Sequence, residues 1–360
     1  MPLFLSLHFD QDVDPEIQSL IHEVLGQGTT PIQPRCATTR TFALTLTDPL
    51  GPLLDLHQAL ISRDQAAALA LHVGAASRLG ETYRSPSVEH TRCLAESGWP
   101  EQILLSQAFM DVHQLPSEAK VADLGLQRLK DLTPSKHIYQ LAHPSLRKRD
   151  FPTLRTLNRV PHNLRPQGRP FIGRQAEIAA LAAPLRAAER RLITLKGPGG
   201  IGKTRLALQV AAETAIHFPD GVYFLSLVSV ESPDTLGSTL VDTLDLTLRG
   251  RRPAHNHILT HLRTKRMLLI LDNFEQLLPA PSLLTEMLEA APDLRLLVTS
   301  RVALEIPEEQ VYPVAGLAYP TEQDGHPTGT YDAVRLFVQA AQRVDPLFVL
   351  SEENRLQVYR

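Results

Sequence analysis

The chain has 360 residues, of which 43% are hydrophobic and 21% charged, and its formal net charge at pH 7 is −3. This composition is typical of a globular protein with room for two or three domains, and the low net charge excludes a general electrostatic attraction to nucleic acid or anionic lipid. Two cysteines, Cys36 and Cys93, are too few for a disulfide framework or a cysteine-based zinc site. No apolar run approaches the ~20 residues of a membrane span and no signal peptide is present, so we expect a cytoplasmic protein without a membrane partner.

Residues 1–142 alternate between apolar runs with strand character and amphipathic segments with helical spacing. Helices are predicted in PEIQSLIHEVL, PLLDLHQALIS and SVEHTRCLAES, and strands in MPLFLSLHFD, TRTFALTLT, AAALALHVGAAS and QILLSQAF. A loop that contains proline precedes the third helix, and a closing segment runs from LGLQRLKDL to HIYQL. This order predicts an α+β domain.

A basic segment rich in proline follows at residues 143–167. Over residues 143–170 the chain carries seven Lys or Arg against one acidic residue, together with five prolines. Proline lacks a backbone donor and favours an extended chain, so we predict an interdomain linker. Its arginines could bind nucleic acid or pack on the acidic domain before them, and we favour a solvated linker that wraps the domain surface.

The apolar run LITLK at 192–196 leads into a glycine-rich turn and then a helix. The turn has the pattern G-x-x-x-x-G-K-[ST] and consists of Gly197, Pro198, Gly199, Gly200, Ile201, Gly202, Lys203 and Thr204. Glycine lets consecutive backbone N–H groups converge on phosphate oxygens at the positive end of the next helix. Lys203 would contact the β- and γ-phosphates, and Thr204 would offer its hydroxyl to Mg²⁺. We therefore predict a site for ATP or ADP with Mg²⁺, and we include the adjacent Arg205 in it.

Strands and helices alternate from residue 168 to residue 318. Further strands are predicted in DGVYFLSL, MLLILDN, LRLLVTS and EQVYPVAGL, with intervening helices such as TLGSTLVDTLDL and PSLLTEMLEAA. Continuous apolar runs are typical of a parallel sheet that helices cover on both faces, and such a sheet binds ligands at the carboxyl edge of its strands. We predict an α/β P-loop NTPase domain with a five-stranded parallel sheet.

Three further motifs fall where such a site needs them. Asp272 ends the apolar strand at 267–272, in the Walker B arrangement in which an acid holds Mg²⁺. Arg301 follows the strand LLVTS, from which an arginine can reach a γ-phosphate. The segment FIGRQAE opens a helix just after the linker and contains Phe171, Ile172, Gly173 and Arg174.

The motifs FIGRQAEI, GPGGIGKT, LLILDNFEQL, LRLLVTSR and YDAVRLFVQAA, in this order and spacing, resemble the NB-ARC/AAA-like module of the bacterial STAND signal-transduction ATPases. The resemblance covers about residues 168–350 and implies an ATP/ADP switch. In that family Gly197–Thr204 would hold the phosphates, Asp272 would serve Mg²⁺, Arg301 would be a sensor arginine, and Phe171–Arg174 would border the adenine. The family continues into a helical lid, a winged helix and often a DNA-binding domain. Residues 319–360 are therefore expected to begin a lid, and the chain to be a fragment of a longer protein.

One departure from the family concerns hydrolysis. Many AAA-like ATPases carry a second acid directly after the Walker B aspartate, and here Asn273 occupies that position. Glu275 is the nearest alternative carboxylate, and we add it to Asp272 and Arg301 as a candidate catalytic residue. We expect slow or absent ATP hydrolysis.

The first domain is similar to a class III nucleotidyl cyclase domain in LALHVGAASRLGETYRSPSV, GWPEQILLSQAF and DLGLQRLKDLTPSKHIYQLAHP, which implies a ferredoxin-like fold. The family holds two metal ions with two aspartates. Only Asp10 or Asp12 could replace the first, and Arg35–Thr39 contains no acid for the second. Glu89 and Cys93 stand where the family has an asparagine and an arginine. We expect no cyclase activity, because a two-metal mechanism that lacks a ligand cannot neutralise the triphosphate.

These observations favour an ATP/ADP-binding signalling switch of a bacterial, transcriptional type. Its expected partners are the nucleotide and other protein domains or protomers, including a dimer through the cyclase-like domain. Nucleic acid would bind only through domains absent from this chain. Two alternatives stay open: an active nucleotidyl cyclase that the attached ATPase regulates, and a passive interaction module that nucleotide only stabilises.

Overall fold

The computed structural model describes the chain apart from residues 12, 15, 27–28, 33–37, 47, 80–81, 132–133, 168–170, 188, 231, 247–253, 278–281, 320–330, 346–347, 352–353, 355–356 and 359–360. The chain forms two compact units. The first contains Met1–Arg159 and Arg165–Pro170, and the second contains Val160–Leu164 and Phe171–Arg360. No helix in the described part of the chain is both long enough and apolar enough to cross a membrane.

The first unit is built on a seven-stranded sheet with the strand order β2-β3-β1-β4-β7-β9-β8. Its first half consists of β1 (Leu3–Phe9), α1 (Ile17–Leu25), β2 (Thr29–Ile32), β3 (Thr39–Leu44), α2 (Leu50–Ser62) and β4 (Ala67–Val73). The four strands pair antiparallel in the order β2-β3-β1-β4, with one helix in each split βαβ connection. This is the predicted ferredoxin-like arrangement, and the α+β prediction is confirmed.

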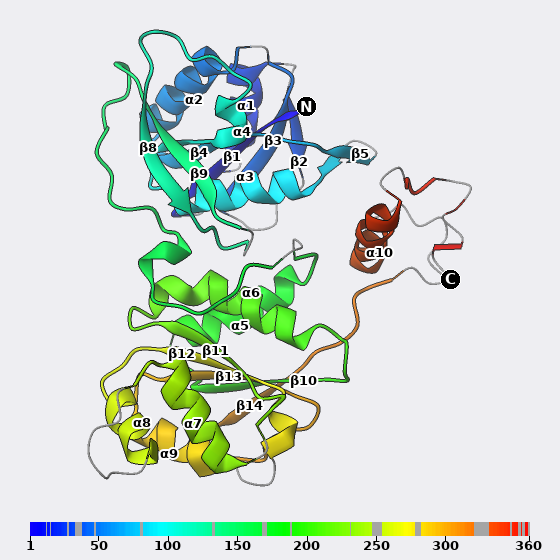
Figure 1. Cartoon of the computed structure of the whole chain (residues 1–360). Coiled ribbons are helices and arrows are strands. Elements are labelled where there is room, and N and C mark those ends of the chain that lie inside the picture. The colour runs from blue at the N-terminus through cyan, green and yellow to red at the C-terminus, as the bar shows by residue number, and fades with distance from the viewer. Residues whose placement is uncertain are drawn as a thin grey trace. The chain divides into compact units, whose positions relative to one another are not determined.

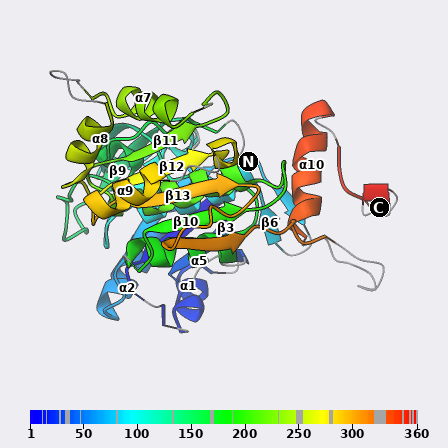
Figure 2. The ribbon, with the colours of Figure 1, turned by 90° about the horizontal axis from the view of Figure 1, so that it is seen from below.

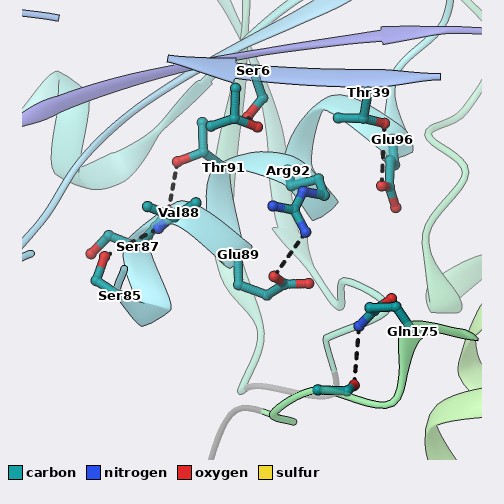
Figure 3. Close-up of polar contacts among 12 residues, drawn as sticks. Ser6, Thr39, Ser85, Ser87, Val88, Glu89, Thr91, Arg92, Glu96 and Gln175 are labelled. Carbon is teal, nitrogen blue, oxygen red and sulfur yellow. Dashed lines mark hydrogen bonds and ion pairs between the residues drawn. The ribbon is translucent and has the colours of Figure 1, made fainter. Parts of the chain in front are cut away.

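The second half of this unit extends the sheet. It consists of the hairpin β5 (Ser77–Leu79) and β6 (Thr82–Arg84), then α3 (Pro86–Ser97), β7 (Ile103–Ser106), α4 (Gln107–Met110), β8 (Lys120–Gln127) and β9 (Lys136–Ala142). Helix α3 begins after Ser85, whose Oγ accepts a hydrogen bond from the backbone N–H of Val88 at 3.3 Å, with Pro86 in the first helical turn (Figure 3). Serine at the cap and proline at the first position are the ordinary signals for such a start.

Strand β1 separates two cores because its side chains alternate between the faces of the sheet. Leu3, Leu5 and Leu7 pack with the apolar faces of α1 and α2. Phe4 packs on the opposite side with Val88 of α3. The sheet therefore has α1 and α2 on one face and α3 on the other (Figure 1).

Two local predictions in this unit differ from the structure. The strand predicted to run through Phe109 ends at Ser106, whose Oγ accepts a hydrogen bond from Phe109 N at 3.2 Å and caps α4. The segment predicted as a loop holds the β5–β6 hairpin. Thr82 and Tyr83 favour a strand, and this preference prevails over the loop signal of the nearby proline.

The second unit contains a five-stranded sheet in which every pair of strands is parallel, with the order β11-β12-β13-β10-β14. Figure 2 shows β11, β12, β13 and β10 side by side. The elements are α5 (Gln175–Arg186), β10 (Leu192–Lys196), α6 (Lys203–Thr214), β11 (Val222–Ser226), α7 (Pro233–Thr243), α8 (Ala254–Leu262), β12 (Leu268–Asp272), α9 (Ser282–Ala290), β13 (Arg295–Ser300) and β14 (Glu309–Pro313). The predicted α/β class and the five-stranded parallel sheet are confirmed, and helix α10 (Asp332–Val344) follows.

Helices cover both faces of this sheet, with α5 and α6 on one side and α7, α8 and α9 on the other (Figure 1). Leu269, Leu271, Leu296 and Val298 of the central strands pack in one core with the helices α7–α9. Strand β12 is buried along its whole length, as its continuous apolar run predicts. Because all five strands run in the same direction, the residues that follow β10, β12 and β13 meet at one edge of the sheet.

Candidate functional site

The glycine-rich turn after β10 adopts a conformation that its glycines make possible. Gly200 and Gly202 have φ values of 77° and 98°, in the left-handed region that favours glycine. A Cβ on Gly197 would lie 3.0 Å from the carbonyl oxygen of Val314, and Gly197 N donates to the carbonyl of Ser300 at 3.2 Å. The first limb of the turn is therefore packed between the ends of β13 and β14.

Lys203 begins α6 directly after this turn, and its side chain is buried. Its Nζ donates to the carbonyl oxygens of Gly197 at 2.8 Å and Pro198 at 3.0 Å. The ammonium group thus lies over the first limb of the turn, at the positive end of α6. The only protein acceptors that hold it in the described structure are neutral carbonyls, which a phosphate oxygen would replace with a stronger, charge-assisted partner.

Asp272 ends β12 beside the turn, and its carboxylate accepts hydrogen bonds from two threonines of the site. Its Oδ1 accepts hydrogen bonds from Thr204 Oγ1 at 2.6 Å and from Thr299 Oγ1 at 2.7 Å. Thr299 Oγ1 in turn accepts from the backbone N–H of Asn273 at 3.0 Å, where the chain turns through φ 63°. The structure brings Thr204 and Asp272 together and adds Thr299, a residue of the motif LRLLVTSR for which the sequence alone predicts no role.

Glu275 and Arg301 form an ion pair at the same edge, with 3.1 Å between Glu275 Oε1 and Arg301 Nε. Glu275 lies in a 3-10 turn (Phe274–Leu277) after β12, and Arg301 follows β13. Two of the three candidate catalytic residues, Glu275 and Arg301, are therefore in direct contact. Neither contacts Asp272 through a hydrogen bond among the described residues.

The segment before α5 supports the glycine-rich turn. Arg174 is buried, and its Nη2 donates to the carbonyls of Ile201 and Ala315, both at 2.9 Å, while Nη1 pairs with Glu177 at 3.2 Å. The guanidinium therefore ties the turn to the residues that follow β14. The family resemblance implies that Arg174 borders the adenine, and the structure directs its side chain to backbone carbonyls.

Phe171 is the first residue of the same segment, which precedes α5. The guanidinium of Arg205 stacks over its ring, with 5.7 Å between Cζ and the ring centroid. Burial lowers the pKa of Arg205 from its usual value. Ile172 beside it is half-buried and Gly173 has φ 71°.

We expect Arg174→Ala to lower the free energy of unfolding by about 2–3 kcal/mol, because it leaves the carbonyls of Ile201 and Ala315 without their donor. Urea unfolding of the whole chain measures the change. Arg186→Ala, which removes an exposed arginine from the last turn of the same helix, is the matched control and should stay within about 0.5 kcal/mol of the wild type. Equal losses for the two variants would contradict the structural role of Arg174.

The first unit contains the residues compared with cyclase ligands. Asp10 accepts two hydrogen bonds from Arg155, from Nη1 at 2.6 Å and from Nη2 at 2.7 Å, and Arg155 stacks on Trp99 with 4.1 Å between Cζ and the ring centroid. Arg155 belongs to the basic segment, which we expected to be solvated. This arginine instead packs on the acidic domain that precedes it. Both oxygens of Asp10 are thereby engaged with a guanidinium.

The other residues that correspond to cyclase ligands are paired, are buried, or lie outside the described residues. Glu89 pairs with Arg92 at 3.2 Å (Figure 3), and Cys93 is buried in the core. Asp12 and Arg35–Ala37 lie outside the described residues. Among the described residues of these turns, the carboxylates of Asp10 and Glu89 are both paired with arginines, so they do not form an open pair of ligands for a metal ion.

We expect Asp10→Asn to lower the free energy of unfolding at pH 7 by less than about 1 kcal/mol, because the carboxylate is partly exposed. The hydrogen bonds from Arg155 hold the pKa of Asp10 below its ordinary value of 3.8, so the pair stabilises the fold above that pH. The stability is lost as the pH falls through the lowered pKa. The difference between wild type and variant should therefore vanish in acid.

Urea unfolding from pH 7 down to about pH 2 measures this difference, because the contribution of the pair is lost only below its ordinary pKa of 3.8. Burial lowers the pKa of His8 to about 4, and the Asp10 carboxylate, 3.8 Å from His8 Nε2, acts to raise it. The contribution of His8 therefore differs between the two proteins until Asp10 itself is protonated, and it becomes equal below that pH. Asp55→Asn, an exposed position on α2, is the control. A difference that persists unchanged at low pH would contradict the role of the Arg155 pair.

The comparisons with known proteins give one family match and several relatives. Residues 186–306 match the family model of the AAA domain. The uncharacterized protein Rv0894 of Mycobacterium tuberculosis is 32% identical over 200 residues, which cover 55% of this chain and 48% of that protein. Rv0890c of the same organism, whose name describes it as an HTH-type transcriptional regulator, is 33% identical over 172 residues, which cover 48% of this chain and 18% of that protein. The chain thus spans about half the length of the first relative and less than a fifth of the second.

Solved structures show weaker similarity. A STAND protein with a tetratricopeptide repeat sensor from Pyrococcus horikoshii aligns at 16% identity and a TM-score of 0.31, over 50% of this chain and 26% of that chain. A Trypanosoma brucei adenylate cyclase aligns at 14% identity and a TM-score of 0.35, over 43% of this chain and 94% of that chain. The sheet topology, the glycine-rich turn and the family match agree on one assignment. Residues 186–306 form an AAA-type P-loop NTPase domain, and such a domain binds nucleotide, usually with Mg²⁺.

Proposed function

We propose that this chain is an ATP/ADP-binding signalling switch with slow or absent hydrolysis, of the STAND type. The observation that carries the proposal is the cluster at the carboxyl edge of the parallel sheet. There the buried Lys203, the hydrogen-bonded pair of Thr204 and Asp272, and Arg301 all lie around one glycine-rich turn. Cationic, hydroxyl and carboxylate groups in this arrangement suit a phosphate chain with its metal ion.

The roles follow from the chemistry of each group. Gly197–Thr204 would bind the phosphates, and Phe171, Ile172, Gly173, Arg174 and Arg205 would border the nucleotide. Mg²⁺ prefers oxygen ligands, and the hydroxyl of Thr204 and the carboxylate of Asp272, 2.6 Å apart, offer two of them. When bound, the metal would neutralise charge on the β- and γ-phosphates.

Slow turnover is supported by the environment of the candidate base. Asn273 follows Asp272 and carries an amide, which cannot accept a proton from water at neutral pH. Glu275 is held by Arg301. With neither side chain free to activate water, we expect turnover well below the typical enzyme median of ~10 per second.

The remaining assignments are proposals about the whole protein. We propose a cyclase-like domain at 1–142, a linker at 143–167, the NTPase domain at 168–318 and the start of a lid at 319–360. The first domain would serve as an interaction or dimer surface without cyclase activity, because Arg155 engages both oxygens of Asp10. A role in transcription draws support from the similarity to Rv0890c.

The experiment that tests the proposed function is the identification of bound nucleotide. The protein is purified and denatured, and the released small molecules are separated and identified. We expect ADP or ATP, or binding of added nucleotide by calorimetry if the preparation is free of it. A preparation that releases no nucleotide and binds neither ADP nor ATP in the presence of Mg²⁺ would contradict the proposal.

A further inference from the structure

Arg301 lies between a carboxylate and the glycine-rich turn. Its Nε pairs with Glu275 Oε1 at 3.1 Å, while its Nη2 points to Gly199, where an added Cβ would lie 3.5 Å from this nitrogen. The Arg301 side chain is 67% exposed, whereas that of Glu275 is 21% exposed. The guanidinium of Arg301 is thus bound by Glu275 through Nε, and much of the side chain is exposed to solvent.

The two oxygens of Glu275 have different surroundings. Oε1 has Arg301 as a partner, but Oε2 is shut off from solvent and has no hydrogen-bond partner among the residues that the structure describes. A carboxylate oxygen without a donor carries a cost in free energy, so the carboxylate depends on its one guanidinium partner. Arg301 has five donors and remains largely hydrated, so it can exchange this partner for another.

The position of Gly199 indicates which ligand group would reach Arg301. The helical end of the turn, at Gly202 and Lys203, presents the backbone N–H groups that cradle the inner phosphates. Gly199 lies in the opposite limb, near the carbonyls of Gly197 and Pro198 that hold the Lys203 ammonium. A phosphate on that side of the turn is the outermost one, which a nucleoside triphosphate has and a diphosphate lacks.

We propose that Glu275 is a positioning residue for Arg301 and a competitor of the terminal phosphate. Without a terminal phosphate, the carboxylate holds the guanidinium beside Gly199. A terminal phosphate carries more negative charge than a carboxylate and accepts two parallel hydrogen bonds from a guanidinium, so it displaces Glu275. This proposal rests on the proposed nucleotide site and adds that the Glu275–Arg301 pair sets the preference between triphosphate and diphosphate.

The proposal makes opposite predictions for the two partners. Removing the charge in Glu275→Gln removes the competitor, so the affinity for a triphosphate should rise while the affinity for ADP stays unchanged. An exposed ion pair contributes at most about 1 kcal/mol, which corresponds to a rise of about two- to fivefold. Arg301→Ala should instead weaken triphosphate binding and leave ADP binding intact.

The experiment is calorimetric titration of the whole chain with ADP and with the non-hydrolysable triphosphate AMP-PNP, both with Mg²⁺. The proteins are the wild type, Glu275→Gln, Arg301→Ala and the double variant, with Glu289→Gln as the control that removes an exposed charge from α9. In the Arg301→Ala background, Glu275→Gln should have no further effect on AMP-PNP affinity. If Glu275→Gln fails to fold, Glu275→Asp, whose shorter side chain withdraws the carboxylate from Arg301, should raise AMP-PNP affinity in the same direction and leave ADP affinity unchanged.

Three outcomes would overturn the proposal. One is a ratio of AMP-PNP to ADP affinity that stays at the wild-type value in both single variants. Another is an effect of Glu275→Gln that persists without Arg301, and a third is an equal effect of Glu289→Gln, which would indicate a general change in charge. Wild-type protein that binds neither nucleotide would overturn the proposed function together with this inference, whereas binding with an unchanged ratio overturns this inference alone.

Discussion

Replacing Lys203 by alanine is expected to weaken the binding of ATP and of ADP by about 100-fold or more. The side chain is buried and its ammonium is directed into the glycine-rich turn, where a phosphate would meet it with little water between them. Truncating one partner of a buried, hydrogen-bonded charge pair costs about 2–5 kcal/mol, and each 1.4 kcal/mol is a factor of about ten in affinity. Calorimetric titration with each nucleotide measures the loss.

Lys265→Ala is the matched control for this variant. Lys265 pairs with Asp220 at 2.9 Å, and these residues precede β12 and β11 at the opposite edge of the sheet. This variant should bind nucleotide as the wild type does, although it also loses a lysine from the same domain. If Lys203→Ala retained wild-type affinity for ATP, the assignment of the glycine-rich turn to the phosphates would be wrong.

The part of this molecule that sequence predicts best is the part whose signals are local. The strands β10, β12 and β13 are continuous apolar runs, and a strand buried on both faces leaves that pattern in its own residues. The turn after β10 is equally local, because its glycines must allow left-handed backbone at Gly200 and Gly202. The placement of Asp272 near Thr204 then follows from a general property of parallel sheets, whose carboxyl ends share one edge.

Contacts between distant segments left no such signal. Arg155 and Asp10 are 145 positions apart, and nothing near either residue announces the other. The basic segment has the composition of a solvated linker, yet Leu154 and Leu157 are buried and Arg155 stacks on Trp99. Burial there depends on which surface the segment meets, and composition does not specify that surface.

The same limit applies inside the candidate site. The family resemblance placed Arg174 near the nucleotide, but the two carbonyls that it contacts come from Ile201 in the turn after β10 and Ala315 just after β14. The role of Thr299 likewise depends on a contact that the sequence does not show, the hydrogen bond from its hydroxyl to Asp272. A polar residue at the end of an apolar strand next to the Asp272 strand is the signal that could have identified it.

Replacing Asp272 by asparagine is expected to abolish most of the effect of Mg²⁺ on ATP affinity. In the wild type, the carboxylate and the hydroxyl of Thr204 offer adjacent oxygen ligands, and the carboxylate supplies the negative charge that a divalent cation needs. The amide oxygen of asparagine can still accept hydrogen bonds from Thr204 and Thr299, so the local structure should be retained while the charge is lost. Titration with ATP in Mg²⁺ and in EDTA gives the ratio of affinities that defines the effect.

The loss of one charge-assisted interaction, about 1.5–3 kcal/mol, should reduce that ratio by about tenfold or more. Asp293→Asn is the control, because Asp293 is exposed just before β13, at the far edge of the sheet, and its loss changes the net charge by the same amount. Lys203→Ala and Asp272→Asn should then fail in different ways. The first weakens nucleotide binding with and without metal, while the second brings the affinity in Mg²⁺ down to that in EDTA. A wild-type ratio in Asp272→Asn would mean that the metal is held by other groups, and that the hydrogen bond from Thr204 to Asp272 serves only to join α6 to β12.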